Sequence, residues 1–133
     1  MNFKSVLRLL NKKQKKKIFI FDQADLLFLE KELSNCKFFA LDTEFDWRTT
    51  YFPKLSLIQI SVNETLFLVD CLTVNPINSL KKYLEDSNIL KIFHSARSDT
   101  IVLSKCLDSN TQNVFDIQIA DILISNEGIN SYA

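Results

Sequence analysis

Short apolar runs alternate along the chain with segments of helical spacing. The runs are rich in Ile, Phe, Leu and Val, residues that favour strands. Two of them are separated only by Asn63-Glu64, which predicts an antiparallel hairpin with a two-residue turn. Strands are predicted at 18–21, 38–41, 55–62, 65–69 and 89–93, with a brief extended piece at 114–115.

Four segments between or after these runs have the apolar spacing of helices. Asp22 precedes the first and is placed to cap it, and Pro76 suits the first turn of the second. Asp116 is placed to cap the last, which ends near Ser125. The helices are predicted over 23–33, 77–85, 97–107 and 117–125.

The order of these elements is strand, helix, three strands, helix, strand, helix, brief strand, helix. The chain therefore begins with a meander and then alternates strands with helices. This order favours a mixed sheet flanked by helices, an α/β fold in one domain of 133 residues.

Composition excludes several classes of site. Gly128 is the only glycine, so neither a P-loop nor a dinucleotide-binding glycine motif is present. The only histidine is His94, and the three cysteines are far apart with no CxxC pair, which excludes zinc fingers and multi-histidine metal sites. No apolar run has the roughly 20 residues needed to cross a bilayer. Together with the cysteine pattern and the absence of a signal peptide, this favours a reduced, cytoplasmic setting.

Charge is distributed unevenly along the chain. Residues 1–17 hold seven of the 16 basic residues and none of the 16 acidic ones, so we expect a basic extension before an acidic domain. An acidic domain repels nucleic acid unless cations bridge the two. The run of lysines favours a solvated tail over a dedicated membrane-binding or nucleic-acid-binding element.

Three carboxylates are the first candidates for chemistry. Asp42 and Glu44 lie at the carboxyl end of a predicted buried strand, and their i, i+2 spacing places them on one face of it. Two adjacent carboxylates repel each other, and a divalent cation bound by their oxygens relieves that repulsion. Asp99, expected in the first turn of the helix over 97–107, would supply a third ligand for a two-metal site. The alternatives are that the pair only faces water and that Asp99 only complements the helix dipole.

Other polar and aromatic residues are less specific. Gln59 is expected to be semi-buried and hydrogen-bonded, and Asp116 to be a helix cap and not a ligand. Phe45, Trp47 and Tyr51 surround the Asp42–Glu44 segment. Such rings can stack on nucleic-acid bases, although the chain has 11 phenylalanines and core filling remains an alternative.

The combined pattern resembles ribonuclease D, a family in the DEDD superfamily of 3′→5′ exonucleases. The stretch around Asp42-Thr43-Glu44 resembles the first exonuclease motif of the family, and the one ending at Asp99 resembles the second. Phe115-Asp116-Ile117-Gln118 resembles its D-T-Q element. The resembling segments are 39–45, 51–60, 68–72, 91–99 and 115–118, in the family's order.

The resemblance implies a ribonuclease H-like fold, a five-stranded mixed sheet with helices on both sides. It implies two Mg²⁺ or Mn²⁺ ions, with Asp42 bridging both, Glu44 on one and Asp99 on the other. It also implies hydrolysis of RNA 3′ ends, notably of transfer-RNA precursors, that releases nucleoside 5′-monophosphates. The main chain near Thr43 and the side chain of Phe45 would contact the terminal nucleotide, and His94 would be structural.

One departure from the family concerns its third motif, which carries a tyrosine and a fourth acidic ligand farther along the chain. Tyr132 stands in a different context and is not assigned to it. We therefore expect residues 18–133 to be an incomplete exonuclease domain that is weak or inactive alone and needs a complementing carboxyl-terminal segment. The alternatives are a non-catalytic nucleic-acid-binding module and an inactive remnant.

Overall fold

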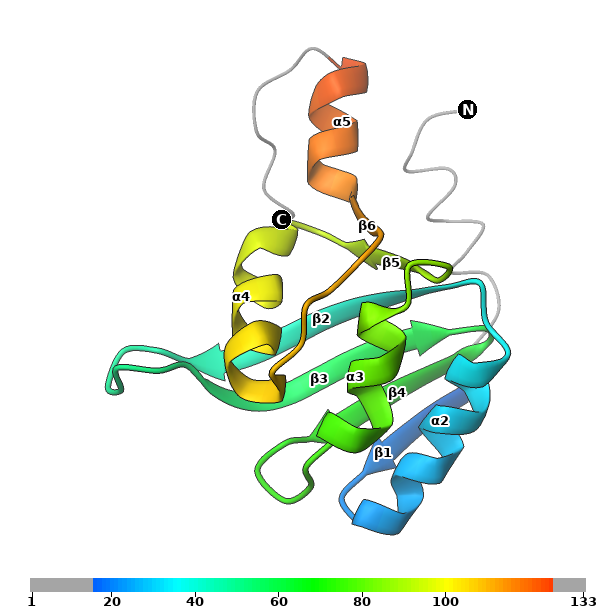
Figure 1. Cartoon of the computed structure of the whole chain (residues 1–133), viewed down its shortest axis with the longest axis vertical. Helices are drawn as coiled ribbons and strands as arrows, with labels where there is room; N and C mark the ends of the chain where they lie inside the picture. Colours follow the sequence, from blue (N-terminus) through cyan, green and yellow to red (C-terminus); the bar gives the residue numbers. More distant parts are fainter. Residues whose placement is uncertain (1–15, 126–133) are drawn as a thin grey trace.

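The computed structural model describes residues 16–125, which form a mixed α/β fold around one sheet (Figure 1). The strand order is β1-β4-β3-β2-β5-β6. β3 runs antiparallel to both of its neighbours, β4 and β2, and the pairs β1–β4, β2–β5 and β5–β6 are parallel. The strands are β1 Lys16–Ile20, β2 Phe38–Asp46, β3 Lys54–Val62, β4 Thr65–Asp70, β5 Leu90–Phe93 and β6 Val114–Asp116. The sheet has six strands instead of five because the brief extended piece pairs with β5.

The helices confirm the predicted order, with small shifts at their ends. The first expected helix is divided into a 3₁₀ turn, whose Ala24 N–H donates to the Asp22 cap at 2.8 Å, and an α-helix. The helices are η1 Gln23–Asp25, α2 Leu26–Ser34, α3 Ile77–Glu85, α4 Ala96–Leu107 and α5 Ile117–Ser125. Figure 1 shows α2, α3 and α4 over one face of the sheet and α5 projecting beyond the end of β6. Within residues 16–125, no helix is long and apolar enough to span a membrane.

The core lies between this helical layer and the sheet. Alternate residues of the central strands are buried, as the two-residue period of a strand requires. Phe39 of β2 and Phe67 of β4 are completely buried, and helix residues such as Leu80 pack in the same cluster. The hairpin turn between β3 and β4 is at Asn63-Glu64 as predicted, with Asn63 in a left-handed conformation (φ 51°) that asparagine tolerates.

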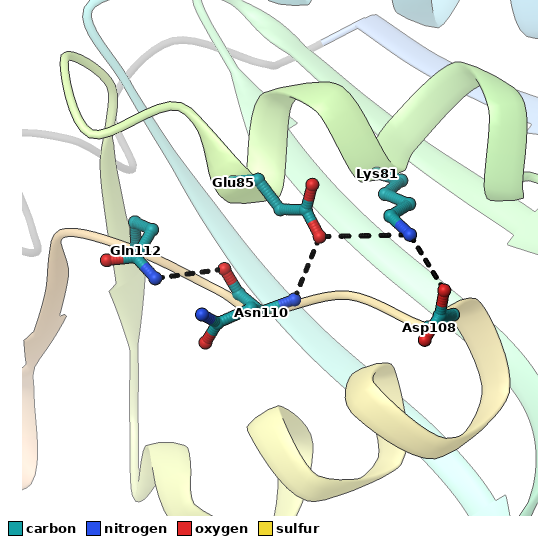
Figure 2. Close-up of polar contacts among 5 residues, drawn as sticks. All are labelled: Lys81, Glu85, Asp108, Asn110 and Gln112. Atoms are coloured by element: carbon teal, nitrogen blue, oxygen red, sulfur yellow. Dashed lines mark hydrogen bonds and ion pairs between the residues drawn. The ribbon is translucent and has the colours of Figure 1, made fainter.

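Polar contacts fasten the connection between α4 and β6 to the end of α3 (Figure 2). The Asn110 N–H donates to Glu85 Oε1 at 3.0 Å, and the Gln112 N–H donates to the Leu84 carbonyl at 2.9 Å. Lys81 forms an ion pair with Asp108 at 2.9 Å. Exposed ion pairs contribute little stability, so the backbone hydrogen bonds are the main constraint on this connection.

Candidate active site

β2 extends farther than the sequence predicted. The pattern indicated a buried strand over 38–41 with Asp42 and Glu44 at its carboxyl end, and the strand continues beyond them to Asp46. The reason is its long pairing with β3, in which Asp42 faces Gln59 and Glu44 faces Leu57. Asp42 and Glu44 are both exposed, whereas Thr43 between them is buried, so the two carboxylates share a face as expected.

Asp99 lies in the first turn of α4, as predicted, and is 6% exposed. Its Oδ1 accepts hydrogen bonds from the Thr43 N–H at 3.0 Å and from the Thr43 hydroxyl at 2.5 Å. The register explains why Thr43 is available, because β5 pairs with β2 only as far as Ala40. Asp99 thus accepts hydrogen bonds from the edge of β2 at the point where the pairing with β5 has ended. These hydrogen bonds connect residues that are 56 positions apart in the sequence.

The charge of Asp42 influences the pKa of Asp99. Burial raises the pKa of Asp99 above its ordinary value, and the negative charge of Asp42 raises it further. The hydrogen bonds from Thr43 act in the opposite direction but do not compensate. A cation bound between Asp42 and Asp99 would favour the ionised form of Asp99.

Gln59 is semi-buried and hydrogen-bonded, as the sequence predicted. Its amide Nε2 donates to Asp42 Oδ2 at 3.3 Å from the neighbouring strand β3. This contact restricts the orientation of one Asp42 oxygen and leaves the other oxygen of that carboxylate for a further ligand.

Aromatic rings extend from the end of β2 into the β2–β3 connection. Phe45 is partly buried against the core, and its ring contacts Trp47 edge-on at 6.4 Å between centroids. Tyr51 is 89% exposed and contacts Phe52 edge-on at 4.9 Å. The Trp47 indole N–H donates to the Tyr51 carbonyl at 3.4 Å. Tyr51 and Phe52, the second 60% exposed, therefore do not fill the core.

The donor set suits Mg²⁺ or Mn²⁺, because carboxylate oxygens are their preferred protein ligands. Asp42 and Asp99 already interact, and Glu44 lies on the same face as Asp42. Among residues 16–125, no three Asp, Glu, His or Cys side chains are gathered closely enough to hold a metal ion by themselves. His94 is half-buried directly after β5, and Tyr132 lies outside the described residues.

Asp116 has a wider role than the sequence indicated. Its Oδ1 accepts from the Gln118 N–H at 2.9 Å, which confirms the predicted cap on α5. The same carboxylate also accepts from the backbone of Ser95 and Ala96 at the start of α4. Burial acts to raise the pKa of Asp116, but the backbone donors outweigh it and the pKa is lowered. No local pattern at 93–99 reveals that the cap of α4 comes from another strand.

The fold and the paired carboxylates are those of a nuclease domain, and the comparisons agree. Residues 8–130 match the family described as 3′-5′ exonuclease, and the chain belongs to that family. Within it, the chain is ribonuclease D-like. It is 40% identical to ribonuclease D of Desulfotalea psychrophila over 82 residues, and this aligned segment covers 61% of this chain and 22% of the relative. It is 39% identical over 80 residues to ribonuclease D of Escherichia coli, covering 60% and 21%.

Solved structures show the same fold. The structure of Escherichia coli RNase D, described as an exoribonuclease involved in structured RNA processing, matches with a TM-score of 0.72 at 33% identity, covering 78% of this chain and 28% of that one. A Trypanosoma brucei RNase D in complex with RNA U12 matches with a TM-score of 0.74 at 24% identity, covering 86% and 41%. The chain spans about a fifth of the length of the two curated relatives.

Proposed function

We propose that this chain carries most of the metal site of a 3′→5′ exoribonuclease of the ribonuclease D type. The observation that carries the proposal is the bond of Asp99 to Thr43, which brings a third carboxylate to the strand segment bearing Asp42 and Glu44. Two Mg²⁺ or Mn²⁺ ions on these carboxylates would activate water and stabilise the leaving oxygen of a phosphodiester.

Each residue of the candidate site has a separate task in this proposal. Asp42, oriented by Gln59, would contact both ions, with Glu44 and Asp99 on one ion each. Thr43 holds Asp99 in place, and the main chain near it would contact the terminal nucleotide. The half-buried ring of Phe45 would pack against that nucleotide.

RNA 3′ ends are the proposed substrates, with transfer-RNA precursors as the first to test. Support comes from the RNA complex of the Trypanosoma brucei relative and from the role in RNA processing described for the Escherichia coli one. We propose a cytoplasmic location. We also propose low activity for the 133-residue chain alone and activation by a complementing carboxyl-terminal segment that supplies the tyrosine and the fourth acidic ligand.

Calorimetric titration with Mn²⁺ tests the metal site directly. The purified chain is compared with Asp42→Ala and with Asp25→Ala, which removes a carboxylate on η1. We expect saturable binding in the unchanged chain and in Asp25→Ala, and its loss in Asp42→Ala. Absence of binding in the unchanged chain would contradict the proposed metal site.

An activity assay separates the enzyme from a binding module. A 5′-labelled oligoribonucleotide is incubated with Mn²⁺, the chain and the complementing segment of a relative, and we expect stepwise shortening from the 3′ end. RNA that is bound but left intact would favour the alternative, a non-catalytic nucleic-acid-binding module. The exposed rings of Trp47, Tyr51 and Phe52 are the observation that keeps this alternative open.

A further inference from the structure

Asp116 lies beside the point where the chain leaves β5 and enters α4. β6 pairs with β5 in parallel, and in this register Asp116 is the partner of Phe93, the last residue of β5. Two residues later, Ser95 has φ 61° and ψ 57°, a left-handed conformation, and α4 begins at Ala96. The sharp turn directs the first backbone N–H groups of α4 toward β6.

Both of these N–H groups donate to the carboxylate of Asp116. The Ser95 N–H donates to Oδ1 at 3.0 Å and the Ala96 N–H donates to Oδ2 at 2.8 Å. The side chain of Ser95 makes no capping bond of its own. A helix start leaves N–H groups without intrahelical partners, and a negative charge there also complements the helix dipole. The start of α4 therefore depends on a residue 20 positions farther along the chain.

We propose that Asp116 is a positioning residue for the metal site, because it fixes the start of α4 and thereby the place of Asp99. Asp99 follows Ala96 by three residues in the same first turn, so a shift of the helix start moves its carboxylate. The hydrogen bonds from the N–H and the hydroxyl of Thr43 hold the Asp99 carboxylate at the strand segment that bears Asp42, and both require Asp99 to keep its position. The link to metal binding rests on the proposed function, whereas the link from Asp116 to Thr43 does not.

Asp116 can act as a fixed point because its own strand is held from two sides. β6 is bonded to β5 in the sheet, and the Lys91 N–H donates to the Asn113 carbonyl at 2.9 Å just before β6 begins. The connection leading to it is fastened to α3 through Asn110 and Glu85 (Figure 2). The position of the carboxylate is thus set by the scaffold and not by α4.

The test uses Asp116→Ala and Asp116→Asn in the 133-residue chain. The control is Asp22→Ala, which removes a carboxylate cap from η1. Two readouts are measured, the amide hydrogen exchange of Thr43 by NMR and the Mn²⁺ affinity by calorimetry. The Thr43 amide reports the place of Asp99, since it donates to that carboxylate. A general loss of stability would speed exchange across the sheet, so the exchange of the core strand amides is recorded in the same spectra.

We expect Asp116→Ala to accelerate Thr43 exchange at least tenfold relative to the core strands. It should weaken Mn²⁺ binding about tenfold, the lower end of the effect of removing a direct partner of a metal ligand, because Asp116 acts on Asp99 through the start of α4. The effects of Asp116→Asn should lie between those of the unchanged chain and of Asp116→Ala, because the amide oxygen replaces only one of the two carboxylate acceptors. Asp22→Ala should change neither readout.

Unchanged Thr43 exchange and Mn²⁺ affinity in a folded Asp116→Ala or Asp116→Asn variant would overturn the inference. If Asp116→Ala fails to fold, the same two measurements on Asp116→Asn decide whether Asp116 positions Asp99. If the unchanged chain binds no Mn²⁺, the proposed function fails, and Thr43 exchange still decides whether Asp116 positions Asp99. The two failures are therefore distinguishable.

Discussion

Asp99 is a carboxylate in an environment that opposes its charge. It is buried and close to Asp42, and its pKa is raised, although hydrogen bonds from Thr43 and from its own backbone N–H favour the ionised form. A group whose pKa is raised on folding contributes stability below its ordinary pKa, and this contribution is lost as the pH rises through the folded pKa. In the metal-free protein, the ionised Asp99 therefore lowers the free energy of unfolding at neutral pH. Residues held in this way are characteristic of functional sites.

The substitution Asp99→Asn tests this conflict. The amide keeps an acceptor for Thr43 and removes the charge, so we expect the metal-free variant to unfold a few degrees higher than the unchanged chain at pH 7. At pH 3, below the ordinary carboxyl pKa of about 3.9, the difference should vanish. Mn²⁺ binding should be lost. Thermal unfolding followed by circular dichroism at both pH values measures the effect.

The control for this variant is Asp25→Asn, which changes an aspartate on η1. Its unfolding midpoint should follow that of the unchanged chain at both pH values. A variant Asp99→Asn that is destabilised equally at pH 7 and pH 3 would show that hydrogen-bond strength, and not charge, dominates at this position.

At the scale of elements, the β2–β3 pair combines the candidate site with its exposed rings. β2 carries Asp42 and Glu44 and then, beyond a register shift at Glu44/Phe45, the chain leads into the connection with Trp47 and Tyr51. The sequence left open whether these rings fill the core or contact bases. The structure shows them exposed, and we propose that they stack on the bases of a single-stranded RNA bound at the metal site.

Removing one of these rings should weaken RNA binding. For Tyr51→Ala, we expect about a tenfold loss of affinity for a single-stranded oligoribonucleotide, since base–aromatic stacking contributes ~1–3 kcal/mol per base. Fluorescence anisotropy with a labelled oligonucleotide measures the change. Phe28→Ala removes a ring on α2 that is 56% exposed, and it should leave the affinity unaltered. Equal affinities for all three proteins would exclude the connection from RNA binding.

At the scale of the whole molecule, the net charge of zero conceals two regions of opposite sign. We propose that the acidic region needs cations to approach nucleic acid and that the basic residues 1–17 supply non-specific affinity. Most of these residues lie outside the described part of the chain, but Lys16 and Lys17 begin β1 and are exposed.

Salt dependence tests this division of charge. Replacement of Lys12, Lys13 and Lys15 by Gln spares β1 and should reduce the slope of log affinity against log salt by about 2, since each neutralised phosphate of a single strand contributes ~0.7. The matched control replaces Lys31, Lys37 and Lys82, which are exposed near α2 and α3. A slope that falls equally in both variants would contradict a specific contribution from the basic extension.

The sequence by itself determined the order of elements, the hairpin turn at Asn63-Glu64 and the shared face of Asp42 and Glu44. These features depend on neighbours within a few positions, through strand and helix periodicity and turn preferences. It also determined the resemblance to ribonuclease D, because several motifs occur in the family's order.

Only the tertiary structure decided the length of β2, the pairing of the brief strand β6 with β5, the bond of Asp99 to Thr43 and the cap that Asp116 places on α4. The two contacts join residues that are 56 and 20 or 21 positions apart. Whether such residues meet depends on strand order and register, which arise from the packing of the whole sheet and leave no periodic pattern in a local segment.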